Sequence, residues 1–178
     1  MKNGMRSWAR IIWTGSIASV LSSATIVLAS RRDAGAAAAG TNGASQWVRG
    51  RLARFRKKPS LRYTATGYAI HHASSIWWAA VHESPAAKRL IRHPVARAAV
   101  VAGLAALVDY RVVPKRFTPG FEAHLTRASM SAVYATFAAG LWLGTRLHDS
   151  FSGISSGSSP RDAGPLSTLP PTGSKREP

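Results

Sequence analysis

The stretch RIIWTGSIASVLSSATIVLAS, from Arg10 to Ser30, decides the fold class, because no charged residue follows Arg10 until Arg31. About twenty residues of α-helix rise about 30 Å, which matches the hydrocarbon core of a bilayer. The stretch therefore predicts a transmembrane helix over residues 10–30. Residues 1–9 form a basic flank with Lys2 and Arg6, which is also typical of a secretory signal peptide, so both interpretations stay open.

Three more mostly apolar windows follow, at residues 63–83, 95–113 and 128–147, and charged residues crowd between them. A soluble helical domain would instead spread its charges along the polar face of each helix. The pattern predicts an all-α, polytopic membrane protein in which about four transmembrane helices form a small bundle. A short loop at residues 84–94 joins the second and third of these helices.

The overall composition limits which partners and which reactions the chain can have. The 178 residues carry a net charge of +17, which indicates an anionic partner such as phospholipid headgroups or nucleic acid. The absence of cysteine excludes disulfides, thiolate metal sites and a thiol nucleophile. The chain has no Ser-His-Asp order, phosphate-binding loop or H-E-x-x-H motif. We therefore expect neither an enzyme nor a bound cofactor.

Residues 31–62 form a basic loop. Trp47, Val48, Leu52 and Phe55 would share one face of a helix over about residues 45–58. A short basic amphipathic helix with a tryptophan suits the headgroup zone of an anionic leaflet. A solvated loop is the alternative, and nucleic acid is disfavoured because no base-reading element accompanies the charges. The predicted headgroup contacts are Trp47, Arg49, Arg51, Arg54, Arg56, Lys57 and Lys58.

Small residues recur along the predicted transmembrane helices. Helices in lipid associate through close backbone contact, which small residues permit. We therefore expect helix packing at Gly67, Gly103, Gly140 and Gly144. The same positions could instead serve a homo-oligomer or a membrane-protein partner.

The second window contains GYAIHHASSIWWAAVHE, with two adjacent histidines near its middle. A histidine at this depth can be a neutral, hydrogen-bonded structural residue, or part of an ion path, a proton path or a ligand site. In an antiparallel hairpin with the third window, Asp109 comes near enough to reach His71 by tilt or through one water. A polar or proton-relay site at His71, His72 and Asp109 is therefore one hypothesis, and a structural role is the other.

A metal site is a weaker hypothesis. Adjacent histidines on a helix point about 100° apart, whereas helical chelates use spacings of three or four residues. Polar residues at three helix ends would nevertheless fall on the same membrane side and could gather around zinc or iron. These residues are His82, Glu83, His93, His148 and Asp149.

Two segments are expected to lie outside the membrane. Residues 114–127 form a basic connector in which Pro114 and Pro119 end the third helix and stiffen the turn. Residues 148–178 are rich in Ser, Gly and Pro and poor in aromatic residues, so we expect a disordered tail.

The connector DYRVVPKRFTPGFEAHLTRAS, taken with GYAIHHASSIWWAAVHE, resembles a group of small bacterial inner-membrane proteins of unknown function over residues 63–147. The resemblance implies a location in the bacterial inner membrane and no activity. The leading interpretation is a structural or interaction component that contacts anionic lipid or a membrane partner. The alternatives are a small transporter or proton-relay subunit using His71 and Asp109, and a membrane-embedded metal-dependent enzyme.

Overall fold

The computed structural model describes residues 2–156, and those residues are helical throughout their regular elements, with no strand among them. The long helices are α1 (Lys2–Ala34), α4 (Thr66–Glu83), α6 (Pro94–Leu107) and α7 (Arg127–Ser156). The short ones are α2 (Ala39–Ala44), α3 (Gln46–Arg49) and α5 (Pro85–Leu90). The 3-10 turns are η1 (Arg51–Phe55) and η4 (Phe121–Ala123), and the π-helical turns are η2 (Leu61–Ala65) and η3 (Val108–Val112).

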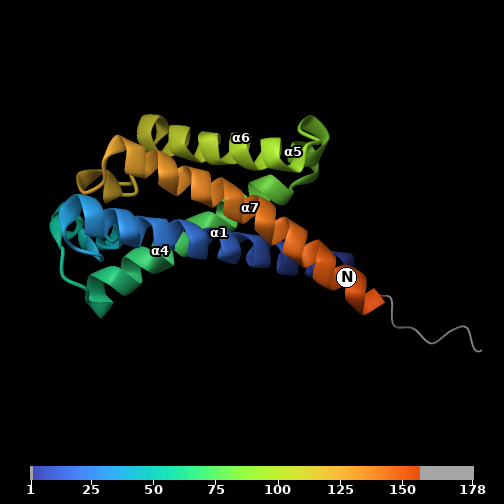
Figure 1. Ribbon diagram of the computed structural model, residues 1–178, viewed down its shortest axis with the longest axis horizontal. Helices are drawn as coiled ribbons and strands as arrows, with labels where there is room; N and C mark the ends of the chain where they lie inside the picture. Colours follow the sequence, from blue (N-terminus) through green and yellow to red (C-terminus); the bar gives the residue numbers. More distant parts are fainter. Residues whose placement is uncertain (1, 157–178) are drawn as a thin grey trace, which may run out of the picture.

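Helices α1 and α7 cross at the centre of the bundle and form its most extensive contact (Figure 1). Glycines of α7 permit the crossing. A Cβ atom at Gly144 would lie 2.8 Å from Thr14 Cα, and one at Gly140 would collide with Ala18 Cα. The two backbones therefore touch, which is how small residues allow helices to pack.

The other two glycines expected at helix contacts behave differently from this pair. Gly67 of α4 is buried against the backbone carbonyl of Thr41, which belongs to α2. Gly103 of α6 is exposed, and no atom lies within 4 Å of where its Cβ would stand. Gly103 therefore makes no helix contact within the described part of this chain, because α6 turns its alanine face, Ala98, Ala102 and Ala105, inward instead.

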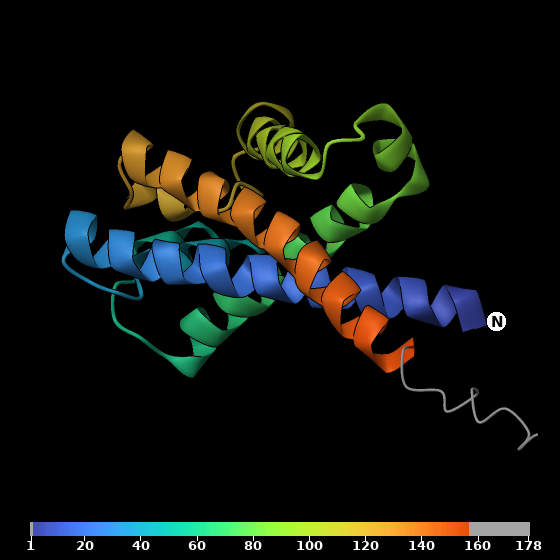
Figure 2. The ribbon, with the colours of Figure 1, turned by 45° about the vertical axis from the view of Figure 1, so that its right-hand side comes forward.

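The remaining long helices flank the central pair. Helix α6 runs alongside α7 (Figure 1), and in the turned view α4 passes behind α1 and α7 and leads into α5 at its C-terminal end (Figure 2). The core cluster where these helices meet consists of Ala18, Ala79, Ala98, Val101, Ala102, Ala105, Phe137 and Leu141.

Small side chains fill the interior, and many large apolar side chains face outward. Buried polar residues of the long helices include Thr14, Ser19, Ser22, Ser75 and Thr145. Exposed apolar ones include Ile12, Val20, Leu21, Leu28, Trp77, Val100, Leu104 and Leu107. Helix α1 is long and apolar enough to cross a membrane over Ser7–Ala34, and within the described part of the chain it alone meets that criterion.

The segments before α4 (residues 35–65) and before α7 (residues 113–126) form a cap over one end of the bundle, on the left in Figure 1. The backbones of Gly43 and Gly120 touch there, and Gly120 takes a φ of 81° that an L side chain rarely adopts. The side chains of Gln46 and Trp47 both donate to the carbonyl of Thr118, at 2.8 and 3.1 Å. These bonds join the cap segments, which are distant in sequence.

Two element boundaries differ from the sequence-based expectation. The amphipathic helix expected over residues 45–58 is broken at Gly50, whose φ of 81° ends α3 before η1 begins. Helix α7 continues past Leu147 to Ser156, into the segment expected to be disordered. The rest of that predicted tail, residues 157–178, lies outside the described residues.

The start of α7 is tied to the end of α1 by Asp33, which follows the apolar part of α1. Its carboxylate accepts hydrogen bonds from the Ser129 hydroxyl at 2.5 Å and from the Thr126 backbone N–H at 2.9 Å. The Arg32 guanidinium also donates to it, at 2.8 Å. The bond from Ser129, with those from Thr126 and Arg32, holds the pKa of Asp33 well below its usual range.

Candidate functional site

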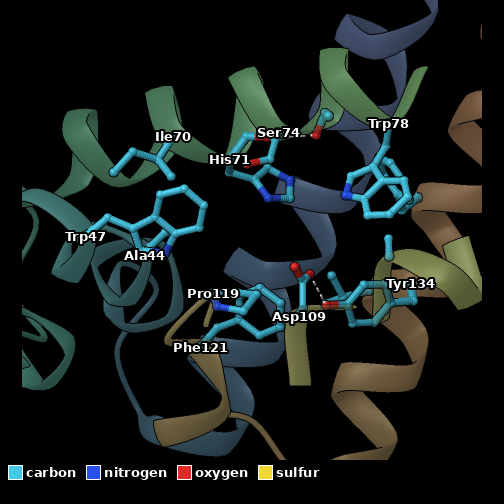
Figure 3. Close-up of a pocket in the computed structure, with 14 residues that line it drawn as sticks. Ala44, Trp47, Ile70, His71, Ser74, Trp78, Asp109, Pro119, Phe121 and Tyr134 are labelled. Atoms are coloured by element: carbon cyan, nitrogen blue, oxygen red, sulfur yellow. Dashed lines mark hydrogen bonds between the residues drawn. The ribbon is translucent and has the colours of Figure 1, made fainter. Parts of the chain in front are cut away.

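A pocket lies between α4, the π-helical turn η3, α7 and the cap (Figure 3). Its empty volume is about 540 Å³ when the open mouth is included. The residues that line it are Ala44, Trp47, Ile70, His71, Ser74, Ser75, Trp78, Ala105, Asp109, Pro119, Phe121, Val133, Tyr134 and Phe137.

His71 reaches this pocket from the buried side of α4. Its neighbours at spacings of four residues, Gly67, Ser75 and Ala79, are all buried, so this face of the helix turns into the bundle. The His71 Nε2 atom lies 2.9 Å from the Ser22 hydroxyl of α1, and the Ser75 hydroxyl donates to the His71 carbonyl at 2.8 Å. The ring is thus held by α1, whereas the second bond is made to the backbone within α4.

His72 does not line the pocket. Its ring stacks on Tyr68, with ring centroids 5.7 Å apart. Adjacent helix residues point about 100° apart, so the two histidines face different surroundings. The structure therefore separates His72 from the proposed group of His71, His72 and Asp109.

Asp109 reaches the pocket from η3, on the wall opposite His71 (Figure 3). The Tyr134 hydroxyl of α7 donates a hydrogen bond of 2.6 Å to Asp109 Oδ2. No hydrogen bond joins Asp109 to His71 among the described residues, so any exchange between them would need a bridging molecule in the pocket.

Asp109 is unusual among the acidic residues of this basic chain. Within residues 2–156, the carboxylates at positions 33, 83, 122 and 149 each pair with an arginine or lysine side chain. Asp109 has no such cationic partner there. A carboxylate away from water costs free energy unless it is protonated or compensated by a nearby charge.

Aromatic rings form much of the pocket wall. Trp47 enters from α3 and is fixed by its hydrogen bond to Thr118 and by an edge-on contact with Phe117, at a centroid distance of 5.7 Å. In Figure 3 Trp78 of α4 lies above Tyr134 of α7 at the right of the cavity, and Trp47 lies at the left. The arrangement can enclose an apolar body and present one carboxylate and one imidazole to it.

A second polar cluster lies at the end of the bundle away from the cap. The buried Glu83 carboxylate receives Arg10 Nε and Lys88 Nζ, each at 2.7 Å, on one oxygen. Thr145 donates to the other oxygen. Arg10 also binds Asp149, at 2.6 Å. The cluster therefore ties α1, α4, α5 and α7 together by ion pairs.

The metal-site hypothesis gains no support from this cluster. Both oxygens of Glu83 are occupied by donors, and Asp149 is held by Arg10. His93 instead accepts a hydrogen bond from the backbone N–H of Ala96 at the start of α6. Nowhere in the described chain do three or more potential metal-ligating side chains from His, Cys, Asp and Glu gather around one point.

The predicted headgroup contacts divide into two groups. Arg49, Arg51, Arg56, Lys57 and Lys58 are exposed on the cap, beside the exposed Leu52 and Phe55. Arg54 instead lies 3.3 Å from Glu122, and Trp47 turns inward to the pocket.

Several residues of these sites were not found from the sequence. Tyr134 holds Asp109, and Arg10 holds both Glu83 and Asp149. Arg97 is buried and donates to the Ile91 carbonyl at 3.1 Å rather than extending to the membrane surface. In the sequence, one feature could have indicated the Arg10–Glu83 ion pair: if α1 and α4 are antiparallel, the start of α1 and the end of α4 lie at the same end of the bundle.

Comparison of this chain with protein-family models, curated proteins and solved structures found no match. The resemblance to small bacterial inner-membrane proteins therefore stays a prediction.

Proposed function

We propose that this chain is a polytopic membrane protein that contacts anionic phospholipid headgroups through its basic cap. The observation that carries the proposal is the inverted distribution of side chains. Small and hydroxylated residues such as Ala18, Ser19 and Ser22 are fully buried in the centre, while Leu28 on the same helix is 68% exposed. Lipid does not drive large apolar groups inward, so helices in membranes pack through small residues and face lipid with large ones.

The two ends of the bundle have the residues expected at the two surfaces of a membrane. The cap carries most of the exposed basic residues at one end, and the Glu83 cluster lies at the other. Trp8 and Trp77, which are 64% and 67% exposed, lie toward the second end, where interfacial tryptophans are expected. The apolar segments between the two ends are the proposed spanning parts.

The cap has the composition of a headgroup-binding surface. Leu52, Phe55 and Leu61 are 77%, 61% and 89% exposed, and Arg56 and Lys57 are exposed among them. Apolar groups that enter the acyl boundary together with cations that meet phosphates favour binding to an anionic leaflet.

Single-cysteine labelling tests the crossing of the membrane, because the chain has no native cysteine. Lys58→Cys in the cap and Arg89→Cys in α5 lie on either side of α4. We expect a membrane-impermeant maleimide to label these two variants from opposite faces of sealed vesicles. Labelling of both from the same face, or release of the protein by alkaline carbonate, would rule out the proposed topology.

A matched pair of triple variants tests the lipid contact. The cap variant replaces Arg56, Lys57 and Lys58 with Gln, and the control replaces Arg89, Arg92 and Arg146, which are exposed at the other end. We measure how far phosphatidylglycerol raises the melting temperature relative to phosphatidylcholine in neutral detergent. The cap variant should lose more of this increase than the control, and equal losses would contradict the assignment.

A small transporter or proton-relay subunit is the second candidate, since His71 and Asp109 line the same pocket. The chain would then conduct protons across proteoliposomes under an imposed potential. Asp109→Asn should abolish that flux while leaving the lipid response of the cap unchanged, and flux equal to that of empty liposomes would exclude this candidate.

A further inference from the structure

The pocket beside Asp109 has the chemistry of a cation site. Asp109 is the one described carboxylate without an arginine or lysine partner, in a chain with 24 basic and seven acidic residues. Its Oδ2 atom accepts only the Tyr134 hydroxyl, a neutral donor that leaves the negative charge uncompensated. The other described carboxylates are thus paired with arginine or lysine side chains, whereas Asp109 faces a cavity.

The walls around that carboxylate are suited to a cation with an apolar body. Trp47, Trp78, Tyr134, Phe121 and Phe137 all line the cavity. The face of an aromatic ring attracts a cation, most strongly for tryptophan, and the attraction grows when water is excluded. A small hydrated metal ion would gain little from such walls, whereas an alkylammonium group would contact them directly.

We propose that this pocket binds an organic cation, an amine or quaternary ammonium group attached to an apolar body, with Asp109 as its counter-ion and Trp47 and Trp78 as aromatic walls. His71, held by Ser22, closes the facing wall as a polar group. The site does not depend on the lipid contact of the cap, and the two proposals fail separately because they involve different residues.

Charge complementarity distinguishes this ligand class from a neutral amphiphile. A neutral ligand would fill the aromatic cavity equally well and leave Asp109 uncompensated. A cation of the same shape gains the carboxylate attraction in addition, so affinity should depend on charge at constant shape.

The test uses the full chain in an uncharged detergent at pH 8 and isothermal titration with benzyltrimethylammonium. Its neutral isostere is neopentylbenzene, in which carbon replaces the quaternary nitrogen. We expect saturable one-to-one binding of the cation, at least tenfold tighter than that of the isostere. Asp109→Asn should weaken cation binding at least tenfold, while the matched control Asp149→Asn, outside the pocket, leaves it unchanged.

Trp78→Leu provides a second variant that keeps the carboxylate and removes one ring. It should weaken binding of the cation several-fold, which keeps the proposal testable if Asp109→Asn fails to elute as folded protein. Three results would each overturn the proposal: no saturable binding of the cation, equal affinity for the isostere, or wild-type affinity in both pocket variants.

Discussion

The close crossing of α1 and α7 predicts that alanine will destabilise the chain at a glycine in the crossing but not at a glycine outside it. Gly140 and Gly103 both lie inside helices, but a Cβ at Gly140 would collide with the backbone of Ala18, whereas one at Gly103 would meet nothing within 4 Å. Replacing either residue with alanine gains about 1 kcal/mol of helix propensity. The two variants therefore differ only in the steric effect at the crossing.

The size of that difference follows from overpacking. A backbone atom cannot move aside as the end of a flexible side chain can, so the two helices must separate around the new methyl group. Overpacking a close contact typically costs about 1–3 kcal/mol. We expect Gly103→Ala to be as stable as the wild type or more so, and Gly140→Ala to be about 1–3 kcal/mol less stable than Gly103→Ala.

The assay is reversible unfolding of the purified chain in mixed micelles, followed by helical circular dichroism as the denaturing detergent fraction rises. Gly144→Ala, where the new Cβ would lie 2.8 Å from Thr14 Cα, should show a smaller loss in the same direction. Equal stability of the Gly140→Ala and Gly103→Ala variants would refute the close approach of α1 and α7.

Three further predictions concern polar contacts. The folded pKa of Asp33 is lowered, so its contribution to stability is present above the unfolded pKa of about 4 and is lost as the pH falls below it; Asp33→Asn should remove this part of the acid sensitivity in thermal melts at pH 3–7. Glu83→Gln, which leaves Arg10 and Lys88 without their buried carboxylate, should cost about 1–3 kcal/mol in the same unfolding assay, whereas Asp149→Asn at an exposed pair should cost less than about 1 kcal/mol. Ser22→Ala, which removes the hydrogen bond to His71, should cost about 0.5–1.5 kcal/mol, and Ser23→Ala on the same helix serves as its control.

The helical class and the approximate positions of the long helices could be predicted from the sequence, because mostly apolar windows bounded by crowded charges are compatible with few other structures. Helix packing at Gly140 and Gly144 was expected from the spacing of small residues, but the helix that they meet was not, and at Gly103 the same spacing has no helix contact among the described residues of this chain. A spacing of four residues identifies a face of a helix, and only the neighbouring helices determine whether that face is buried.

The pocket was only partly predictable. Hairpin geometry suggested that His71 and Asp109 lie at similar depth, and both line the same cavity. Trp47 was expected to contact lipid headgroups, yet it turns inward. Its indole N–H donates a hydrogen bond to the carbonyl of Thr118, in a loop far along the sequence. Contacts of this kind depend on how two loops meet, which periodicity along one segment does not encode.

Helix α1 links these sites, which bears on the two interpretations of the first apolar stretch. Its Arg10 is the shared partner of Glu83 and Asp149, and its Ser22 holds His71 at the pocket. Its Ala18 fits against Gly140 at the centre of the bundle. A helix that acted only as a transient leader would need none of these contacts, and its loss would leave Glu83 without its arginine and open a gap along α7. The described contacts of α1 from Arg10 to Ser22 are those expected of a helix that stays in the folded bundle.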